Sequence, residues 1–373
     1  MTEPVYLDYN ATAPLRPEAA AAMREALGAL GNASSVHGFG REQRRRVEEA
    51  REAVAALAGG PVAGVVFTGS GSEANNLALL GSGRGRRLVS AGEHESVLQV
   101  DPRAGWIPLD ENGLVRLDAL EAALVADDKP ALVSVMLANN ETGVLQPIEA
   151  VVEIARRHDA LVHCDAVQAA GRVPLDMTAL GFDLMTLSAH KLGGPQGVGA
   201  LLMMDGLEIA PQIRGGGQER RRRAGTENVA GIVGFGAAAE AARAGLADIG
   251  RIEALRDSLE SQAKQALPEA VVIGAEAPRL PNTSCLALPG LSAETQAIGL
   301  DLAGVAVSAG SACSSGKVDS SHVLRAMGLD EALAGAAIRV SLGWASRESD
   351  VAAFIAGWTE LHRRADRGAR LAG

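Results

Sequence analysis

Residues 160–191, ALVHCDAVQAAGRVPLDMTALGFDLMTLSAHK, hold two short apolar runs that each end in polar side chains. The first run, 160–164, stops at Asp165, and the second, 182–187, stops at the segment Ser188-Ala189-His190-Lys191. Short continuous apolar runs are typical of strands that are buried on both faces, as in a parallel sheet. Ligands of such sheets collect beyond the carboxyl ends of the strands. We therefore expect the acid and the lysine to meet at one edge of a sheet.

Similar apolar runs at residues 62–67, 132–137 and 198–203 extend this pattern in both directions. Segments between the runs, such as 148–158, show helical periodicity. Strands that alternate with helices predict an α/β fold, in which a mostly parallel sheet carries helices on both of its faces.

The C-terminal part of the chain has a different pattern. Residues 251–267 form a charged amphipathic stretch without Gly or Pro, and a last helix is expected near 350–363. Strand-like pieces lie between them at 270–273 and 284–288. This pattern predicts a smaller α+β domain. We divide the chain into an N-terminal segment that packs with the small domain (1–15), a large ligand-binding domain (16–248) and a small C-terminal domain that carries the Cys313 loop (249–373).

Composition excludes several classes of protein. A chain of 373 residues, with 47% hydrophobic and 21% charged residues, has the make-up of an ordinary globular protein of more than one domain. Its 35 basic and 45 acidic residues give a net charge of −10, which argues against a general nucleic-acid-binding role. We expect no membrane-spanning run and no signal peptide, and hence a cytoplasmic location.

Positive charge is carried almost entirely by arginine, so each lysine needs a reason. Arginine cannot form a Schiff base, because its guanidinium does not lose a proton at usable pH. Lys191 lies between apolar strands and precedes Gly193-Gly194, which disfavours a plain surface charge. Partial desolvation there would make its neutral amine available as a nucleophile. Of the basic clusters, 44–46 fits a solvated helix face, and 220–223 is expected to border the active site or a subunit interface.

The three cysteines are an odd number without paired spacing, so neither a disulfide framework nor a metal site is expected. Cys164 and Cys285 lie in apolar, strand-like surroundings and are interpreted as buried and inert. Cys313 lies among small polar residues, 308–316, in a segment that is expected to be a flexible loop with a reachable thiol. A lone cysteine in a loop is more often incidental than catalytic, so this residue needs support from elsewhere.

A candidate phosphate site follows the first apolar run. Residues 67–73 join a predicted strand to a helix that is expected to begin near Ser72. Exposed N–H groups at a helix start, with small residues around them, form an anion site. The alternative is an ordinary Gly-Ser loop in which Ser72 caps the helix.

Together these residues match the needs of pyridoxal phosphate (PLP). This cofactor takes a lysine amine for a Schiff base, and an acid that keeps its ring nitrogen protonated so that the ring can act as an electron sink. Lys191 and Asp165 provide that pair.

At this point the chain resembles a known family, the cysteine desulfurases of the NifS/IscS group, in the class V aminotransferase branch of the fold-type I PLP enzymes. The resemblance runs nearly end to end and implies a large domain with a mostly parallel seven-stranded sheet, plus a smaller α+β domain. Each motif alone is weak, and the ordered set is specific. The motifs are Leu7-Asp8-Tyr9-Asn10-Ala11-Thr12, Gly31-Asn32-Ala33-Ser34-Ser35 with His37, Glu93-His94, Asn139-Asn140-Glu141-Thr142-Gly143, Asp165-Ala166-Val167-Gln168, Ser188-Ala189-His190-Lys191, Arg223-Ala224-Gly225-Thr226-Glu227-Asn228, the Cys313 loop and Ile338-Arg339-Val340-Ser341.

The resemblance implies a role for each matching residue. Lys191 would hold PLP covalently, Asp165 would pair with the ring nitrogen and Gln168 would bond the phenolic oxygen. His94 would stack on the ring and assist proton transfers, and Cys313 would receive the sulfur. The phosphate would bind Gly71, Ser72, Ser188 and His190, with Thr226 reaching it from the neighbouring subunit of a homodimer. Asn140 is implied in both cofactor and substrate binding, and it would share the substrate carboxylate with Arg339.

One departure affects the phosphate loop. The family usually has Thr-Ser-Gly-(Ala/Gly)-Thr-Glu, whereas this chain has Thr68-Gly69-Ser70-Gly71-Ser72-Glu73. A serine hydroxyl can replace that of threonine, so phosphate binding is expected to survive with a changed donor set.

The implied activity is removal of sulfur from L-cysteine, which gives L-alanine and a persulfide on Cys313. An iron–sulfur scaffold protein is the leading sulfur acceptor, and tRNA thiolation is the next candidate. The spacing from Cys313 to Leu324 looks like that of the longer-loop group, which passes sulfur directly to partners. The alternatives are an aminotransferase or selenocysteine lyase of the same fold, a non-catalytic scaffold protein, and a nucleic-acid-binding protein that uses residues 220–223.

Overall fold

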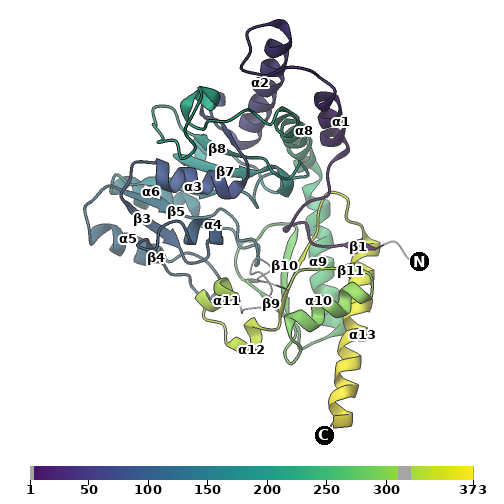
Figure 1. The fold of residues 1–373 in the computed structure, drawn as a ribbon. Coiled ribbons are helices and arrows are strands. Elements are labelled where there is room, and N and C mark those ends of the chain that lie inside the picture. Colours follow the sequence, from purple (N-terminus) through teal and green to yellow (C-terminus); the bar gives the residue numbers. More distant parts are fainter. Residues whose placement is uncertain (1–3, 310–320, 373) are drawn as a thin grey trace.

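The large sheet occupies the centre of the computed structural model, which describes residues 4–309 and 321–372 (Figure 1). Its order is β2-β8-β7-β6-β5-β3-β4, and only β8 runs antiparallel to its neighbours. The expected mostly parallel, seven-stranded sheet is therefore confirmed. Its strands are β2 (Val66–Thr68), β3 (Arg86–Ser90), β4 (Gly105–Ile107), β5 (Ala131–Ser134), β6 (Leu161–Asp165), β7 (Leu184–Ser188) and β8 (Gly199–Met203).

Three segments differ from the expected pattern. The run 62–67 is not one strand, because Val62–Gly64 forms the 3-10 turn η1 after Pro61. The two strands β3 and β4 were not expected. Arg86 and Arg87 open β3, and β4 is only the three residues Gly105-Trp106-Ile107, so neither strand has an apolar run as long as the expected ones.

Helices of the large domain pack closely through small residues. Helix α2 contacts α8, where a Cβ atom at Gly236 would lie 2.7 Å from Ala50. Helix α1 also packs on α8 (Figure 1). This close approach explains how a chain with few aromatic residues fills its core. The helices of this part are α1 (Pro17–Leu27), α2 (Gly38–Ala58), α3 (Gly71–Gly81), α4 (Glu95–Leu98), α5 (Leu117–Val125), α6 (Ile148–Arg157), α7 (Met177–Leu180) and α8 (Val229–Gly245).

One helical run bears on the expectation that no stretch could span a membrane. Helix α8 continues through the 3-10 turn η4 (Leu246–Asp248) into α9 (Ile249–Ala266), and the run Val229–Ala266 passes a test of length and composition. In α8 the apolar residues Ile232, Phe235 and Ala239 are buried inside the fold. Packing against α1 and α2 therefore accounts for the apolar character of α8.

A second, smaller sheet lies beside the first, with order β12-β10-β9 and antiparallel pairing. Helix α13 packs on α9 and α10, and Phe354 and Trp358 of α13 are fully buried there. The N-terminal strand β1 (Val5–Tyr6) pairs in parallel with β11 (Val305–Ala306). The elements of this part are β9 (Val271–Ile273), β10 (Thr283–Ala287), α10 (Ala293–Leu302), α11 (His322–Ala326), α12 (Glu331–Ala334), β12 (Ala337–Ser341) and α13 (Glu348–Ala372).

Candidate active site

The acid and the lysine lie at the carboxyl ends of two neighbouring parallel strands. Asp165 is the last residue of β6, and Ser188 is the last residue of β7. The 3-10 turn η2 (Ala189–Lys191) follows β7 directly and carries the lysine. The two residues thus come to one edge of the sheet, as the apolar runs of the sequence indicated.

Lys191 is half-buried and its amine contacts the N-terminal segment. Its Nζ donates to the carbonyl oxygens of Asn10 at 2.6 Å and Ala11 at 2.9 Å. Both of these partners are neutral groups. The segment 5–12 therefore forms one wall of the site, close to the nitrogen that would react.

Asp165 is 6% exposed and is held by two donors. Its Oδ1 accepts from the Val167 N–H at 3.0 Å, and its Oδ2 accepts from Asn75 Nδ2 at 2.8 Å. A second acid lies nearby, since burial and the negative charge of Asp165 raise the pKa of the Glu93 carboxyl well above its usual range. The two acids thus lie close together, and Asp165 is held by donors on both of its oxygens.

His190 and Ser188 lie beside the loop that precedes α3. A Cβ atom at Gly71 would be 3.3 Å from Ser188 Cβ, so glycine allows the start of α3 to approach the end of β7. The His190 Nδ1 lies 3.2 Å from Thr12 Oγ1. Burial, and then the positive charge of Lys191, lower the pKa of His190 to about 4, so its ring is neutral at physiological pH. A neutral ring can still donate one N–H to an anion.

The start of α3 differs from the expected one. Ser70 is the N-cap residue, and its side chain accepts from the Glu73 N–H at 3.1 Å, which makes Ser72 a first-turn residue with an exposed position. Glu73 in turn accepts from the Gly69 N–H at 2.7 Å and pairs with Arg223 at 2.8 Å. Several small residues in a row fit an N-cap equally well, and only this hydrogen bond selects Ser70.

Gln168 is oriented by a buried arginine that the sequence did not point to. Its Oε1 accepts from Arg172, and its Nε2 donates to the Asn10 carbonyl at 3.1 Å. Arg172 also donates to the carbonyls of Tyr9 and Lys191, both at 3.2 Å. Burial first, and then the charge of Arg339, lower the pKa of Arg172 to about 9. One guanidinium thus ties together three segments around the lysine.

His94 precedes α4 and is joined to Asp165 by hydrogen bonds. Its Nδ1 lies 2.8 Å from Ser96 Oγ and accepts from the Ser96 N–H at 3.1 Å. Ser96 Oγ accepts from Asn75 Nδ2 at 2.9 Å, and the same nitrogen contacts Asp165. The sequence reasoning missed Asn75 and Ser96, although an asparagine on a mostly apolar helix is a usable signal.

Arg339 and Asn140 come together, with an unexpected acid beside them. Arg339 in β12 is 4% exposed, and its Nη1 donates to the Asn140 carbonyl at 2.9 Å. Its Nη2 pairs with Asp8 at 2.7 Å, while its Nε is buried without a partner among the described residues. The guanidinium expected to hold a substrate carboxylate is therefore already engaged by Asp8, which the substrate would have to displace or share.

Thr226 lies apart from these residues, exposed on the loop between η3 (Gln218–Arg221) and α8. Just before this loop, three successive residues of η3, Glu219, Arg220 and Arg221, have φ values of 44°, 55° and 67°. Such values are unfavourable for residues with a Cβ atom. Its exposed position leaves Thr226 accessible to a second subunit.

Both ends of the Cys313 segment are described, although Cys313 itself lies outside the described residues. On one side, Ser308 and Arg339 exchange backbone hydrogen bonds of 3.1 and 2.8 Å. On the other side, the His322 Nε2 lies 2.9 Å from the Glu93 carbonyl. The segment thus leaves the fold beside Arg339 and returns next to the residue that precedes His94.

The other two cysteines are buried, as expected. Cys164 lies in β6 and Cys285 in β10, and each is at most 2% exposed. Burial raises the pKa of the Cys164 thiol well above its usual range and that of Cys285 to about 12. Neither forms a thiolate at physiological pH, so neither is a nucleophile.

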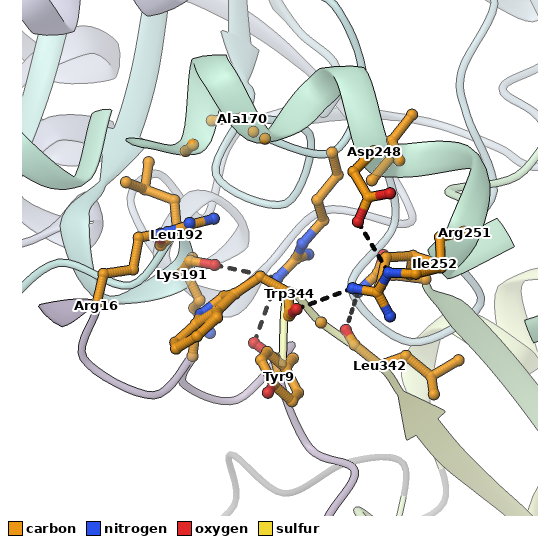
Figure 2. Close-up of a pocket in the computed structure, with 18 residues that line it drawn as sticks. Tyr9, Arg16, Ala170, Lys191, Leu192, Asp248, Arg251, Ile252, Leu342 and Trp344 are labelled. Carbon is orange, nitrogen blue, oxygen red and sulfur yellow. Dashed lines mark hydrogen bonds and ion pairs between the residues drawn. The ribbon is translucent and has the colours of Figure 1, made fainter. Parts of the chain in front are cut away.

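A cavity of about 100 Å³ lies behind the lysine, between the N-terminal segment, η2, the α8–α9 junction and the end of β12 (Figure 2). Arg16 crosses it, with its guanidinium 5.3 Å from the Trp344 ring centre. Of the expected site residues that the structure describes, only Lys191 lines it. The cavity belongs to the junction of the two sheets and not to the phosphate site.

Comparisons with known proteins agree with this architecture. The model of the aminotransferase class-V family matches residues 5–354. A cysteine desulfurase of Cereibacter sphaeroides is 45% identical over 355 residues, 91% of this chain and 91% of its own length. Cysteine desulfurase IscS of Dictyoglomus turgidum is 41% identical over 366 residues, 94% of this chain and 92% of its own. The X-ray structure of a NifS-like protein from Rickettsia africae matches with a TM-score of 0.90 and 35% identity, over 97% of this chain and all of that one.

These matches cover nearly the whole length on both sides, and they confirm the fold-type I architecture that the ordered motifs implied. The chain belongs to the class-V aminotransferase family, within its NifS/IscS group of cysteine desulfurases.

Proposed function

We propose that this protein is a PLP-dependent cysteine desulfurase, which converts L-cysteine into L-alanine and leaves the sulfur as a persulfide on Cys313. The observation that carries the proposal is the meeting of Lys191 with Asp165 at adjacent strand ends. Family membership supports it, and so does the burial of the other two thiols, which leaves Cys313 as the candidate nucleophile.

The described residues fit the cofactor. Asp165 keeps lone pairs beyond the bonds to Val167 and Asn75, so it can also accept a ring N–H. Gly71 lets the start of α3, with its exposed N–H groups, approach Ser188 closely, and the neutral His190 can donate to a phosphate bound there. When bound, PLP supplies an electron sink for charge that develops at the Cα of the substrate.

Each residue then has a task in the reaction. Lys191 would hold the cofactor through its Nζ and would take the Cα proton of the substrate on the same atom. Arg339 and Asn140 bind the substrate carboxylate, which exchanges with Asp8 at the guanidinium. Gln168, fixed by Arg172, presents its amide N–H to the phenolic oxygen. Thr226 of a second subunit completes the phosphate site in a homodimer.

The sulfur step balances without an external oxidant. The Cys313 thiolate attacks the sulfur of the substrate, the S–S bond forms as the Cβ–S bond breaks, and the electron pair of that bond remains with the carbon fragment. Protonation of the fragment gives alanine, and the enzyme retains a persulfide.

The anchors of the Cys313 segment are compatible with this step. Ala309 follows Ser308, which pairs with Arg339, and Cys313 is four residues further on. The substrate carboxylate would lie at the same arginine.

The finer assignments are part of the same proposal. An iron–sulfur scaffold protein is the proposed acceptor of the persulfide sulfur, and the protein is expected to act in the cytoplasm. Its net charge of −10 disfavours nucleic acid as a direct partner.

The deciding experiment incubates the purified protein with L-cysteine and a reductant, and measures sulfide and alanine together. We expect equal amounts of the two products. Cys313→Ala should abolish both while leaving cofactor absorbance intact, and Lys191→Ala should abolish covalent cofactor attachment. Cys285→Ala, which removes a buried thiol, is the matched control and should retain turnover. Sulfide release by Cys313→Ala, or alanine formation that depends on an added keto acid, would refute the proposal.

A further inference from the structure

A chain of hydrogen bonds joins the Asp165 carboxylate to the imidazole of His94. We infer that Asn75 and Ser96, the two links of this chain, are positioning residues that hold His94 as its Nε2–H tautomer. The inference deepens the proposed function and rests on it for the ring that His94 faces. The geometry of the four described side chains carries it.

The first link fixes the amide of Asn75. An ionised carboxylate only accepts hydrogen bonds, so the Asn75 atom that lies 2.8 Å from Asp165 Oδ2 is the amide nitrogen. The second proton of this nitrogen points to Ser96 Oγ at 2.9 Å. Asn75 is 1% exposed, and turning the amide would place its oxygen against two other oxygens. The orientation of Asn75 therefore follows from the charge of Asp165.

The second link fixes the hydroxyl of Ser96. Its oxygen accepts from Asn75, so its single proton is left to donate, and His94 Nδ1 lies 2.8 Å away. The backbone N–H of Ser96 donates to the same nitrogen at 3.1 Å. An Nδ1 atom that faces two donors must offer its lone pair, so the proton of the neutral ring resides on Nε2.

This tautomer decides what His94 can do. Its basic lone pair is engaged by Ser96, and the other nitrogen carries a proton. In the resting enzyme the Nε2 of His94 is thus a hydrogen-bond donor and not a base. Removal of the Cα proton falls to Lys191, and His94 can supply a proton from Nε2 at a later step. The Asp165 carboxylate and the His94 imidazole are coupled through three hydrogen bonds.

The test observes the histidine directly. The full-length holoenzyme and apoprotein, labelled with ¹⁵N-histidine, are examined by NMR at a pH where the rings are neutral, and His94→Gln assigns the signal among the seven histidines. We expect the His94 Nδ1 to be unprotonated and Nε2 to be protonated in both forms. A protonated Nδ1, or an equal mixture of tautomers, would overturn the inference without any need for a variant.

Variants then test the two links. Ser96→Ala and Asn75→Ala should move the His94 signals away from the fixed Nε2–H position and lower kcat about tenfold, with KM changed less than twofold. Ser96→Thr restores a hydroxyl and should recover both readouts. Gln99→Ala, which removes an exposed contact with Glu95 at the end of the same helix, is the control and should change neither.

The outcomes separate this inference from the proposed function. If Ser96→Ala leaves both the tautomer and kcat unchanged, Ser96 has no positioning role. If the wild type shows the Nε2–H tautomer but releases no sulfur from L-cysteine, the assignment of the activity fails while the tautomer assignment stands.

Discussion

At the scale of single residues, the buried histidine of β6 makes the free energy of unfolding depend on pH. His163 is fully buried between the hydroxyls of Ser134 in β5 and Thr186 in β7, at 2.9 and 3.0 Å. Burial lowers the pKa of His163 to about 4, although the charge of Asp165 opposes the shift. Above its usual pKa of about 6.5 the ring is neutral in both the folded and the unfolded chain.

The sign of the effect follows from proton uptake. Between pH 6.5 and 4 the unfolded chain binds a proton at His163 and the folded chain does not, so stability falls as the pH falls through this window. A shift of this size corresponds to a loss on the order of 3 kcal/mol. We expect His163→Gln to show a shallower decline of the free energy of unfolding, measured by urea titration from pH 7.5 to 4.5. A decline as steep as that of the wild type would assign the pH dependence to other groups.

The residue scale also shows what the sequence could and could not predict about the site. Asp165 and Lys191 were predictable, because each directly follows an apolar run and strand ends converge in a parallel sheet. Arg172 was not, because its partners Tyr9, Gln168 and Lys191 meet only in the folded protein. The pairing of Arg339 with Asp8 was hidden for the same reason.

At the scale of elements, the loop that carries Thr226 is held in place by a buried ion pair. Glu219 accepts from Arg51 of α2 at 2.8 and 3.0 Å, and also from the Phe67 N–H at 3.0 Å. Arg51 and Glu219 are 4% and 6% exposed. The left-handed turn at 219–221 therefore persists because its first residue is fixed at α2 and β2.

Removing one partner of this pair leaves the other charge buried and alone. We expect Arg51→Met to lower the free energy of unfolding by about 3–5 kcal/mol, and Glu219→Gln added to it to recover a large part of the loss. Urea denaturation of the single and double variants measures this coupling. Arg45→Met, which breaks an exposed pair with Glu49 on the same helix, is the control and should have no measurable effect. Equal losses in the single and double variants would mean that the ion pair carries no such coupling.

Elements were predictable where the apolar pattern was continuous. β5, β6, β7 and β8 follow the expected runs within a few residues. β3 and β4 lie toward one edge of the sheet. The two arginines at the start of β3 interrupt the apolar pattern, and β4 is only three residues long. At 62–67 the turn after Pro61 shortens the strand, and the apolar pattern alone does not predict this turn.

At the scale of the whole molecule, the proposed homodimer has a direct test. If Thr226 of one subunit serves the phosphate site of the other, a Lys191→Ala subunit and a Thr226→Leu subunit are each defective, and a mixed dimer contains one intact site. Random mixing of refolded subunits would then restore about one quarter of the wild-type sites. The measurement is sulfide release before and after mixing. No gain on mixing would place both groups of each site on one chain.

The pairing of β1 has a consequence for how the protein is made. Asp8 bridges to Ser341, and Asn10 donates its N–H to the hydroxyl of the same serine, across a sequence separation of 331 residues. Synthesis releases the N-terminus first, so this segment cannot pair with Ser341 until nearly all of the polypeptide has emerged from the ribosome. Because Asn10 and Ala11 also touch the reactive lysine, the enzyme would acquire a finished catalytic centre only after translation ends. We therefore expect nascent chains to bind the vitamin-derived coenzyme only when synthesis is nearly complete.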